Sequence, residues 1–484
     1  MILGITSQNH DASLALIDND KIVWAAHSER YSRVKNDRLL NADIISDMFS
    51  YGHPTQIVWF EQPIKKSLRR LWSGERPWFV SPKDELKKYN LDQFPIEYVS
   101  HHESHAAAGF YTSNFNDAAI LVVDAVGEWD TVSIWEGQDN NLKKIWSKHY
   151  PHSIGMFYTA FTHYLGLKPN EEEYILMGMA AFGQPKIVDR LKEDFFIDFN
   201  GPNFKLKHNL HQGCRWWDRP ENISDFDIAA SVQAITEEYL IATVKWIKEH
   251  TNSKNFIFMG GCALNCVANS KIAELELFDN IWIMPNPGDA GSAIGAVAAL
   301  TKQHLNWQGP FLGKNIDRTV DIDAVVKELI NGKVVALANG RAEFGPRALG
   351  NRSLLCDPRG KDAKPKMNQL KRREEFRPFA PAILAEQVYN YFNMPVKDSP
   401  YMQFVAKCRY PDELPGICHV DQTSRVQTVT KQDNSIFRYI LEEWDRKTGC
   451  PILMNTSLNV KGEPLVNSWE DAQRWEKING VKVF

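Results

Sequence analysis

Two stretches of the chain share one alternation of short apolar runs and polar loops. The first occupies residues 2–26 and the second occupies residues 119–146. In each, an apolar run leads through a polar loop to a second run, and a turn with Asn and Asp leads to a third. This order predicts a three-stranded β-meander with a polar first loop. Because the order returns, we predict two similar lobes that face each other.

A helical period follows in the middle of the chain. Apolar residues recur at helical spacing over residues 227–250, and this amphipathic helix leads to an apolar strand at residues 255–259. A glycine pair then turns the strand into another helix, and a second strand-loop-helix unit occupies residues 281–299. Such units indicate an α/β scaffold, and glycines at the turn let a phosphate or ribose approach a helix N-terminus, although a plain tight turn looks alike. The candidate nucleotide contacts are Gly260, Gly261 and Asn265.

The candidate chemistry begins at residues 101–105, which read His-His-Glu-Ser-His before small residues that predict the start of a helix. Residues i and i+4 share a helix face, so we expect His101 and His105 to point at one spot and His102 to point elsewhere. A chance pair of histidines is the alternative. Carboxylates after two apolar strands favour a metal site: Asp124 and Asp289. Two histidines with two carboxylates suit Fe(II), Mn(II) or Zn(II), among which these residues do not choose.

A second domain is predicted after a polar segment. Residues 301–317 contain glycine and proline and are predicted to form a linker, and residues 322–338 then read as a helix and a strand. Two later segments, 340–353 and 368–379, are rich in arginine. Arginine beside flexible backbone suits phosphate, whereas basic residues interleaved with phenylalanine also suit a polynucleotide. Acids interrupt the second segment, which favours a pocket for a small polyanion.

Length and composition narrow the class of protein. With 484 residues the chain exceeds one core of usual size, so we expect two domains. The chain is 43% apolar and has no apolar run of the length that a membrane span needs. Its start reads as a strand and not as a secretory leader, so we expect a cytoplasmic protein. Seven cysteines without a Cys-x-x-Cys pair argue against a disulfide framework and a zinc ribbon, and a net charge of −4 gives no overall attraction to nucleic acid.

Eleven different short motifs follow one another along nearly the whole chain. They include Asn9-His10-Asp11-Ala12-Ser13, Glu29-Arg30 to Lys35, His101 to Phe110, Val123-Asp124 to Trp129, Met177-Gly178-Met179-Ala180, Gly260 to Asn269, Pro287 to Gly295, Gly340 to Ser353, Asn368 to Pro381, His419 to Val429 and Asn455 to Pro464. This series resembles the NodU/CmcH family of O-carbamoyltransferases. The resemblance implies an α/β chain with a duplicated actin/Hsp70-like (Kae1-like) domain at residues 1–308 and an α+β YrdC-like domain at residues 309–484.

The resemblance also implies a two-step, ATP-dependent reaction. The YrdC-like domain would form carbamoyl adenylate from carbamoyl phosphate and ATP, with Mg2+ accompanying ATP, and the Kae1-like domain would transfer the carbamoyl group to an acceptor hydroxyl. The implied contacts to polyanions and nucleotide in the second domain are Arg347, Lys371, Arg377, Arg425, Asn455, Thr456 and Ser457. His101, His105, Asp124 and Asp289 match the metal ligands, with Fe2+ as the ion implied first and Mn2+ or Zn2+ as alternatives. His10 and Lys35 match residues beside the carbamoyl group.

Three positions depart from the family pattern. Ile175 stands where a lysine is expected, and Gln422 and Ala125 each replace a glycine. The alternatives are a threonylcarbamoyl-type tRNA modification enzyme, an actin-like kinase or ATPase, and a non-catalytic binding module. The first loop lacks the Asp-x-Gly-Thr of actin-like kinases, and a binding module would leave the four metal ligands without a role.

The acceptor is the partner that the sequence leaves open. The resemblance implies a small natural product or a sugar with a free hydroxyl, and in some members a hydroxymethylated base in DNA. No membrane partner is expected, and a homodimer is compatible with the sequence.

Overall fold

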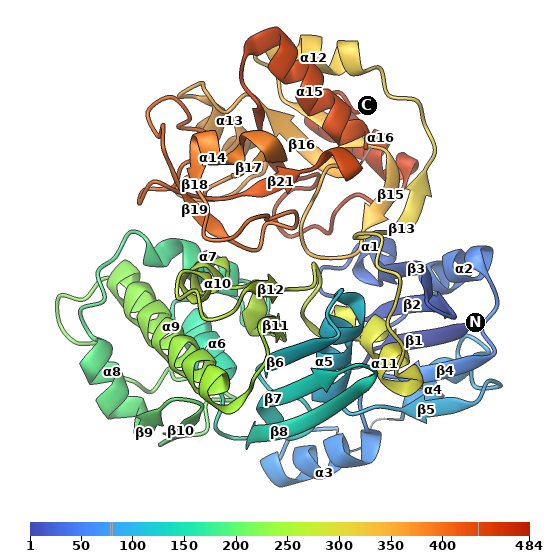
Figure 1. Cartoon of the computed structure of the whole chain (residues 1–484), viewed down its shortest axis with the longest axis vertical. Coiled ribbons are helices and arrows are strands. Elements are labelled where there is room, and N and C mark those ends of the chain that lie inside the picture. Colours follow the sequence, from blue (N-terminus) through green and yellow to red (C-terminus); the bar gives the residue numbers. More distant parts are fainter. Residues whose placement is uncertain (78, 80, 434) are drawn as a thin grey trace. The chain divides into compact units, whose positions relative to one another are not determined.

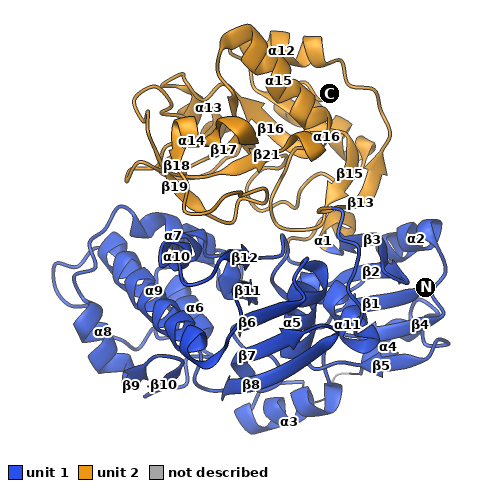
Figure 2. Cartoon of the chain, in the orientation of Figure 1, with its two compact units in different colours: residues 1–28, 36–308 blue, residues 29–35, 309–484 orange. Residues whose placement is uncertain are grey.

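The structure is a computed structural model that describes residues 1–77, 79, 81–433 and 435–484. The chain forms two compact units (Figure 2). Unit 1 comprises residues 1–28 and 36–308, and unit 2 comprises residues 29–35 and 309–484.

Unit 1 is built on two five-stranded sheets with one topology. The first contains β1 (Ile2–Thr6), β2 (Ser13–Asp18), β3 (Lys21–His27), β4 (Gln56–Trp59) and β5 (Ile96–Tyr98), in the order β3-β2-β1-β4-β5. The second contains β6 (Asp117–Val123), β7 (Asp130–Gln138), β8 (Asn141–His149), β11 (Asn255–Met259) and β12 (Asn280–Trp282), in the order β12-β11-β6-β7-β8. In each sheet the three meander strands are antiparallel, and the next two strands run parallel to the first.

Two helices pack between these sheets (Figure 1). Helix α11 (Ser292–Thr301) packs on β1, β2 and β4, α5 (His101–Thr112) packs on β6, β7 and β11, and the two helices pack on each other. Glycine permits the close approach, because a Cβ on Gly295 would lie 1.8 Å from the Ser104 carbonyl oxygen, and one on Gly4 would lie 1.8 Å from that of Ala293. The helix pair therefore joins the two sheets through backbone contacts.

Further helices surround this centre. The other described elements of unit 1 are α2 (Ala42–Tyr51), α3 (Pro63–Ser73), α4 (Pro82–Lys87), α6 (Ile154–Tyr164), α7 (Glu173–Ala180), α8 (Val188–Phe195), β9 (Phe196–Asn200), β10 (Asn203–Leu206), α9 (Asp225–His250), η1 (Gly261–Leu264), α10 (Cys266–Ala273) and η2 (Asp289–Gly291). The long helix α9 packs against α6, α7, α8 and α10. Its N-terminus has a reciprocal capping box between Ser224 and Asp227, which satisfies free backbone N–H groups there.

Unit 2 is built on one mixed five-stranded sheet with a core on each face. The sheet contains β14 (Val335–Ala338), β16 (Arg352–Cys356), β17 (Ala380–Leu384), β21 (Gln427–Val429) and β22 (Ile452–Ser457), in the order β14-β16-β22-β17-β21. Alternate residues of β14 enter different cores, as the period of a strand requires: Ala336 and Ala338 enter one, and Val335 and Leu337 the other. Both faces of the sheet are therefore covered.

Helices and small sheets complete unit 2. They are α1 (Glu29–Ser32), β13 (Phe311–Ile316), α12 (Ile322–Ile330), β15 (Gly340–Glu343), α13 (Ala363–Leu370), η3 (Ala385–Gln387), α14 (Val388–Tyr391), β18 (Phe392–Asn393), β19 (Val405–Cys408), β20 (Thr423–Arg425), η4 (Lys431–Asp433), α15 (Ile436–Thr448) and α16 (Trp469–Asn479). Residues of α13 and α16 enter the core that contains Ala336, and residues of α12 and α15 enter the other.

The α/β class predicted from the sequence is confirmed, with one correction in the expected linker. Residues 311–316 form β13, which pairs with β15, because Leu312 and Ile316 are apolar and become buried. Among the described residues, no helix combines the length and apolarity needed to cross a membrane.

Candidate functional site

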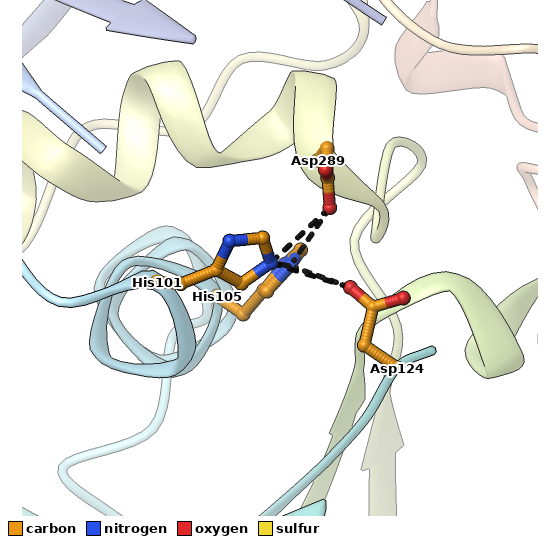
Figure 3. Close-up of side chains that lie close together, drawn as sticks. All are labelled: His101, His105, Asp124 and Asp289. Carbon is orange, nitrogen blue, oxygen red and sulfur yellow. Dashed lines mark hydrogen bonds and ion pairs between the residues drawn. The ribbon is translucent and has the colours of Figure 1, made fainter. Parts of the chain in front are cut away.

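Four side chains of unit 1 converge on one point (Figure 3): His101, His105, Asp124 and Asp289. One ligand atom from each lies within 4.8 Å of those of the others. The Nε2 atoms of the two histidines are 3.2 Å apart. Each Nε2 lies 3.2 to 3.4 Å from Asp124 Oδ2 and Asp289 Oδ1.

These spacings and donors fit a divalent cation. Ligand atoms about 2.0–2.1 Å from a common ion lie about 2.8–3.0 Å apart at octahedral angles and about 3.3–3.4 Å apart at tetrahedral angles. The observed spacings of 3.2 to 3.4 Å are closest to the tetrahedral values. Two carboxylates also bring two negative charges into a buried place, which a divalent cation neutralises. Imidazole with carboxylate suits Fe(II), Mn(II) and Zn(II).

The fold gathers these ligands from three elements. Helix α5 begins at His101, so His105 lies one turn later on the same face. Asp124 follows the last residue of β6, and Asp289 opens η2 directly before α11. Because α5 packs on both β6 and α11, the end of the strand and the start of η2 meet the first turn of α5.

Polar side chains lie behind both histidine rings, within hydrogen-bond distance for His105 and farther away for His101. His105 Nδ1 lies 3.2 Å from Ser292 Oγ. His101 Nδ1 is buried, and its near carboxylate is Glu61, whose Oε2 lies 3.9 Å away. Glu61 is itself buried and paired with Lys66. Partners of this kind leave Nε2 of each ring available as a metal ligand.

The two carboxylates are held in a similar way. The Asn9 side chain donates to Asp289 Oδ2 at 2.9 Å, which leaves Oδ1 facing the histidines. The backbone N–H of Ala125 donates to Asp124 Oδ1 at 2.7 Å, which leaves Oδ2 facing them. Each carboxylate therefore offers one oxygen to the cluster and uses the other to fix its orientation.

Opposite charges shift the acid–base equilibria of the cluster. Burial lowers the pKa of His101 and His105, but the facing aspartates outweigh burial and the net pKa of both rises. Burial raises the pKa of Asp124 and Asp289, but the imidazoles outweigh it and both carboxylates stay ionised. Both histidines therefore attract a positive charge at Nε2, which a divalent cation supplies in place of protons.

His102 has the separate role that helical spacing predicted. Its Nδ1 lies 2.8 Å from Ser133 Oγ, on β7 and away from the metal cluster. Burial lowers the pKa of His102 to about 3, so it is a neutral core histidine.

His10 lies beside a carboxylate. Its Nδ1 is 3.0 Å from Asp11 Oδ2, and its Nε2 is 3.3 Å from Asn36 Nδ2. Burial lowers the pKa of His10, but Asp11 and, more weakly, Asp289 raise it to about 10. His10 is therefore a cation at neutral pH, better suited to donate a hydrogen bond than to accept a proton.

Lys35 belongs to unit 2, although it was expected beside His10 in the first domain. Its Nζ lies 3.4 Å from Glu29 Oε2, within the 29–35 segment. Its charge contributes to lowering the pKa of Lys371, so the two lysines lie in one electrostatic neighbourhood.

The expected nucleotide turn forms at the end of β11. Gly260 has φ of +88°, and a Cβ there would lie 2.2 Å from the Val123 carbonyl oxygen, so both conformation and space require glycine. Gly261 starts η1, and a Cβ there would lie 3.2 Å from Asp124 Oδ1. The Asn265 side chain caps α10 by accepting from Ala268 N at 3.1 Å. The turn thus lies directly beside Asp124 of the four-residue cluster.

Several polar residues at these sites escaped the sequence-based prediction. Glu128 accepts from the backbone N–H of His101 at 3.1 Å and from that of Gln62 at 2.7 Å, so it ties the Asp124 loop to α5 and α3. Gln233 exchanges hydrogen bonds of 3.0 Å with Asn265 and accepts one from Tyr158 at 2.8 Å. Glu128 lies in the loop after β6, as Asp124 does, so its place in the sequence could have marked it as a candidate. Gln233 is one of many polar residues on the long helix α9, so its place in the sequence does not distinguish it.

A buried lysine centres the candidate site of unit 2. Lys371 Nζ donates to Ser457 Oγ at 3.0 Å, to Asn459 Oδ1 at 2.8 Å and to the backbone carbonyl groups of both residues. Burial and the charges of Arg373, Arg377 and Lys35 place its pKa well below the usual value. These cations make the surroundings of Ser457 strongly electropositive.

The other expected residues of unit 2 lie on the sheet and nearby loops. Asn455, Thr456 and Ser457 are consecutive on β22, and the Asn455 amide donates to Gln427 Oε1 at 2.7 Å and to the Ala348 carbonyl at 3.1 Å. Asn455 Oδ1 is buried with no hydrogen-bond partner among the described residues, which leaves an acceptor for a ligand donor. Arg377 NH1 donates to Glu374 at 3.3 Å. Arg347 precedes β16, and Arg425 ends β20.

The three residues that depart from the expected family pattern, Ile175, Gln422 and Ala125, differ in their structural setting. Ile175 is a buried residue of α7. Gln422 adopts φ of +65° in a turn closed by its N–H and the His419 carbonyl at 2.9 Å, a conformation that glycine adopts without strain. Ala125 retains the backbone N–H that binds Asp124, a function that does not require glycine.

Two family models cover most of the chain. Residues 77–298 match the carbamoyltransferase N-terminus, and residues 326–483 match the carbamoyltransferase C-terminus. Among solved structures, full-length HypF in the phosphate- and nucleotide-bound form covers 62% of this chain and 46% of its own, with 12% identity and a TM-score of 0.38. That likeness is too weak to assign a fold.

Several proteins are similar to the chain along nearly its whole length. An uncharacterised protein of Synechocystis sp. is 35% identical over 98% of this chain and 93% of its own. Nodulation protein U of Rhizobium fredii is 36% identical over 98% of this chain and 92% of its own. The 3'-hydroxymethylcephem-O-carbamoyltransferase of Amycolatopsis lactamdurans is 26% identical over 99% of this chain and 97% of its own. The chain therefore belongs to the NodU/CmcH family of carbamoyltransferases.

Proposed function

We propose that this carbamoyltransferase uses ATP and carbamoyl phosphate to carbamoylate an acceptor hydroxyl in two half-reactions. Unit 1 would be a Kae1-like transfer domain, a proposal supported by the shared topology of its two sheets. Unit 2 would be a YrdC-like domain that forms carbamoyl adenylate. The observation that carries the proposal is the cluster of His101, His105, Asp124 and Asp289, which would hold a divalent cation next to the turn at Gly261.

In the first half-reaction, water hydrolyses carbamoyl phosphate to carbamate and inorganic phosphate, and a carbamate oxygen then attacks the α-phosphorus of ATP. The new P–O bond forms as the bond to the β-phosphate oxygen breaks, and pyrophosphate leaves with Mg2+. Arg377 and Lys35 supply positive charge that offsets the negative charge building on the phosphates, and Lys371, whose charged form burial and these cations disfavour, would gain a proton beside the phosphate charge. Asn455 Oδ1 offers an acceptor to a donor group such as the carbamate NH2.

In the second half-reaction, the acceptor oxygen attacks the carbamoyl carbon, the bond from that carbon to the phosphate oxygen breaks, and AMP leaves. A divalent metal at the four ligands, with Fe2+ preferred over Mn2+ and Zn2+, supplies charge stabilisation to the phosphate. Protonated His10 donates a hydrogen bond to the carbamoyl oxygen, and its carboxylate partner Asp11 receives the hydroxyl proton. Gly260, Gly261 and Asn265 form the adenosine-side turn beside the metal.

The proposed acceptor is a small natural product or sugar with a free hydroxyl, and a hydroxymethylated base in DNA is the other class to include. The deciding experiment supplies ATP and labelled carbamoyl phosphate with a panel of such acceptors. We expect AMP and pyrophosphate to form only when carbamoyl phosphate or carbamate is present, and label to enter one acceptor. Formation of ADP instead would support a kinase and contradict the proposal.

A further inference from the structure

Helix α3 lies at the edge of unit 1 (Figure 1), and four of its apolar side chains are exposed. Ile64 is 72% exposed, Leu68 and Leu71 are each 56% exposed, and Trp72 is 63% exposed. Their spacing of i, i+4, i+7 and i+8 places all four on one side of the helix. Single exposed apolar residues are common on protein surfaces, but four on one helix face form an apolar patch of the kind that marks an interaction site.

The opposite side of α3 is cationic and buried. Lys66 pairs with the buried Glu61, and the Arg69 guanidinium pairs with Glu75. Arg70 is also buried and donates to the Pro77 carbonyl at 3.3 Å. Rolling the helix to bury its apolar side would break these ion pairs and leave buried charges without partners, so the outward apolar face is built into the fold.

Charge distinguishes this patch from an ordinary protein interface. Residues 62–83 contain six basic residues and one acidic residue, in a chain of net charge −4, and three of the basic residues are exposed: Lys65, Arg76 and Lys83. The acidic residue, Glu75, is already paired with Arg69. Lys65 is exposed next to the apolar face, Arg76 is exposed just after the helix, and Phe79 beyond it is 67% exposed. The surface is thus apolar, aromatic and bordered by cations.

We propose that α3 docks the protein onto an anionic lipid surface. A helix that combines Leu, Ile and Trp on one face with bordering Lys and Arg lies in the plane of the membrane interface, with its apolar face among the acyl chains and its cations at the headgroups. A second copy docked through the same face would instead set the exposed cations Lys65 and Arg76 of the two copies against one another. This proposal departs from the expectation of no membrane partner, and it does not depend on the reaction proposed above.

The test is flotation of the purified full-length protein with vesicles of phosphatidylcholine, with and without phosphatidylglycerol. We expect binding to the mixed vesicles, and at least about tenfold weaker binding to phosphatidylcholine alone or in high salt. The double variant L68Q/W72Q should lose about tenfold or more of this affinity because it removes apolar burial. Ile478→Gln, which changes an equally exposed residue of α16, should bind as the unaltered protein does.

Folding and self-association are checked separately. L68Q/W72Q should keep the circular dichroism spectrum and metal content of the unaltered protein, since both side chains are exposed. A second variant, Lys65→Gln, should weaken binding to the mixed vesicles without altering binding to phosphatidylcholine alone. Absence of vesicle binding, equal binding to neutral and anionic vesicles, or a dimer in solution that L68Q/W72Q dissociates would each overturn the proposal.

Discussion

At the scale of single residues, the histidines of α5 provide the most direct test of the metal centre. His105→Ala removes one of four ligands whose nitrogen lies 3.2 to 3.4 Å from both carboxylates. We expect the purified variant to carry at most about a tenth of the metal of the unaltered protein after mild chelation, because one ligand is lost and two buried carboxylates stay uncompensated. Elemental analysis measures this. His149→Ala, at a half-exposed histidine of β8, is the control, and equal metal in both variants would contradict the assignment.

Glu61 offers a finer test, because it acts behind a ligand. Its carboxylate lies between Lys66 and His101 Nδ1, so Glu61→Gln keeps the shape of the side chain but removes the charge that favours a proton at Nδ1. We expect metal affinity to fall about 10–100-fold, measured by competition with a chelator. The control is Glu103→Gln on α5, the helix that carries His101. The Glu103 carboxylate accepts a hydrogen bond from Ser100 Oγ. Matching affinities for the two variants would show that Glu61 has only a structural role.

At the scale of elements, the crossing of α5 and α11 depends on Gly295. Adding a methyl group there sets a Cβ 1.8 Å from the Ser104 carbonyl oxygen, so the helices must separate. Gly295→Ala should destabilise unit 1 by about 1–3 kcal/mol and also lower metal content, because α5 carries both histidine ligands. In Gly178→Ala, on α7, the new Cβ meets nothing within 4 Å, and a gain of about 0.5–1 kcal/mol is expected. Chemical denaturation checks both, and a neutral Gly295→Ala would refute the packing argument.

Elements that rest on local periodicity could be predicted from the sequence. The strands of both meanders, the helix after Asp225 and the shared face of His101 and His105 all follow from spacing within a few residues. Local periodicity did not predict the position of Glu61. Glu61 lies near His101 because β4, which ends just before Glu61, pairs with β5, which ends just before α5. Lys35 shows the limit most clearly, since nothing within residues 29–35 reveals which unit will hold them.

At the scale of the whole molecule, two half-reactions assigned to two units should separate by mutation. Lys371→Ala removes the buried amine that donates to Ser457 and Asn459 and would face the phosphates, and it should abolish carbamoyl adenylate formation. His10→Ala should spare that step and prevent transfer to an acceptor. Release of pyrophosphate measures the first step, and labelled acceptor measures the second.

Synthetic carbamoyl adenylate provides the control for this division. Supplied directly, it should restore transfer by the Lys371→Ala protein and leave the His10→Ala protein inactive. The opposite pattern of rescue, or equal loss of both steps in both variants, would contradict the division of labour between the units.

The segment 29–35 gives the chain an unusual path, because it belongs to unit 2 while unit 1 holds the residues on both sides of it. The polypeptide therefore passes between the units three times. Within unit 2, the Arg33 guanidinium donates to the carbonyl groups of Pro464 and Leu465, so this short segment is fastened to residues far away in sequence. A gene fragment that starts at residue 309 would encode an incomplete unit. An end-to-end fusion of two complete genes would not by itself produce this path. A single proteolytic cut would not separate the two units, because the chain passes between them three times.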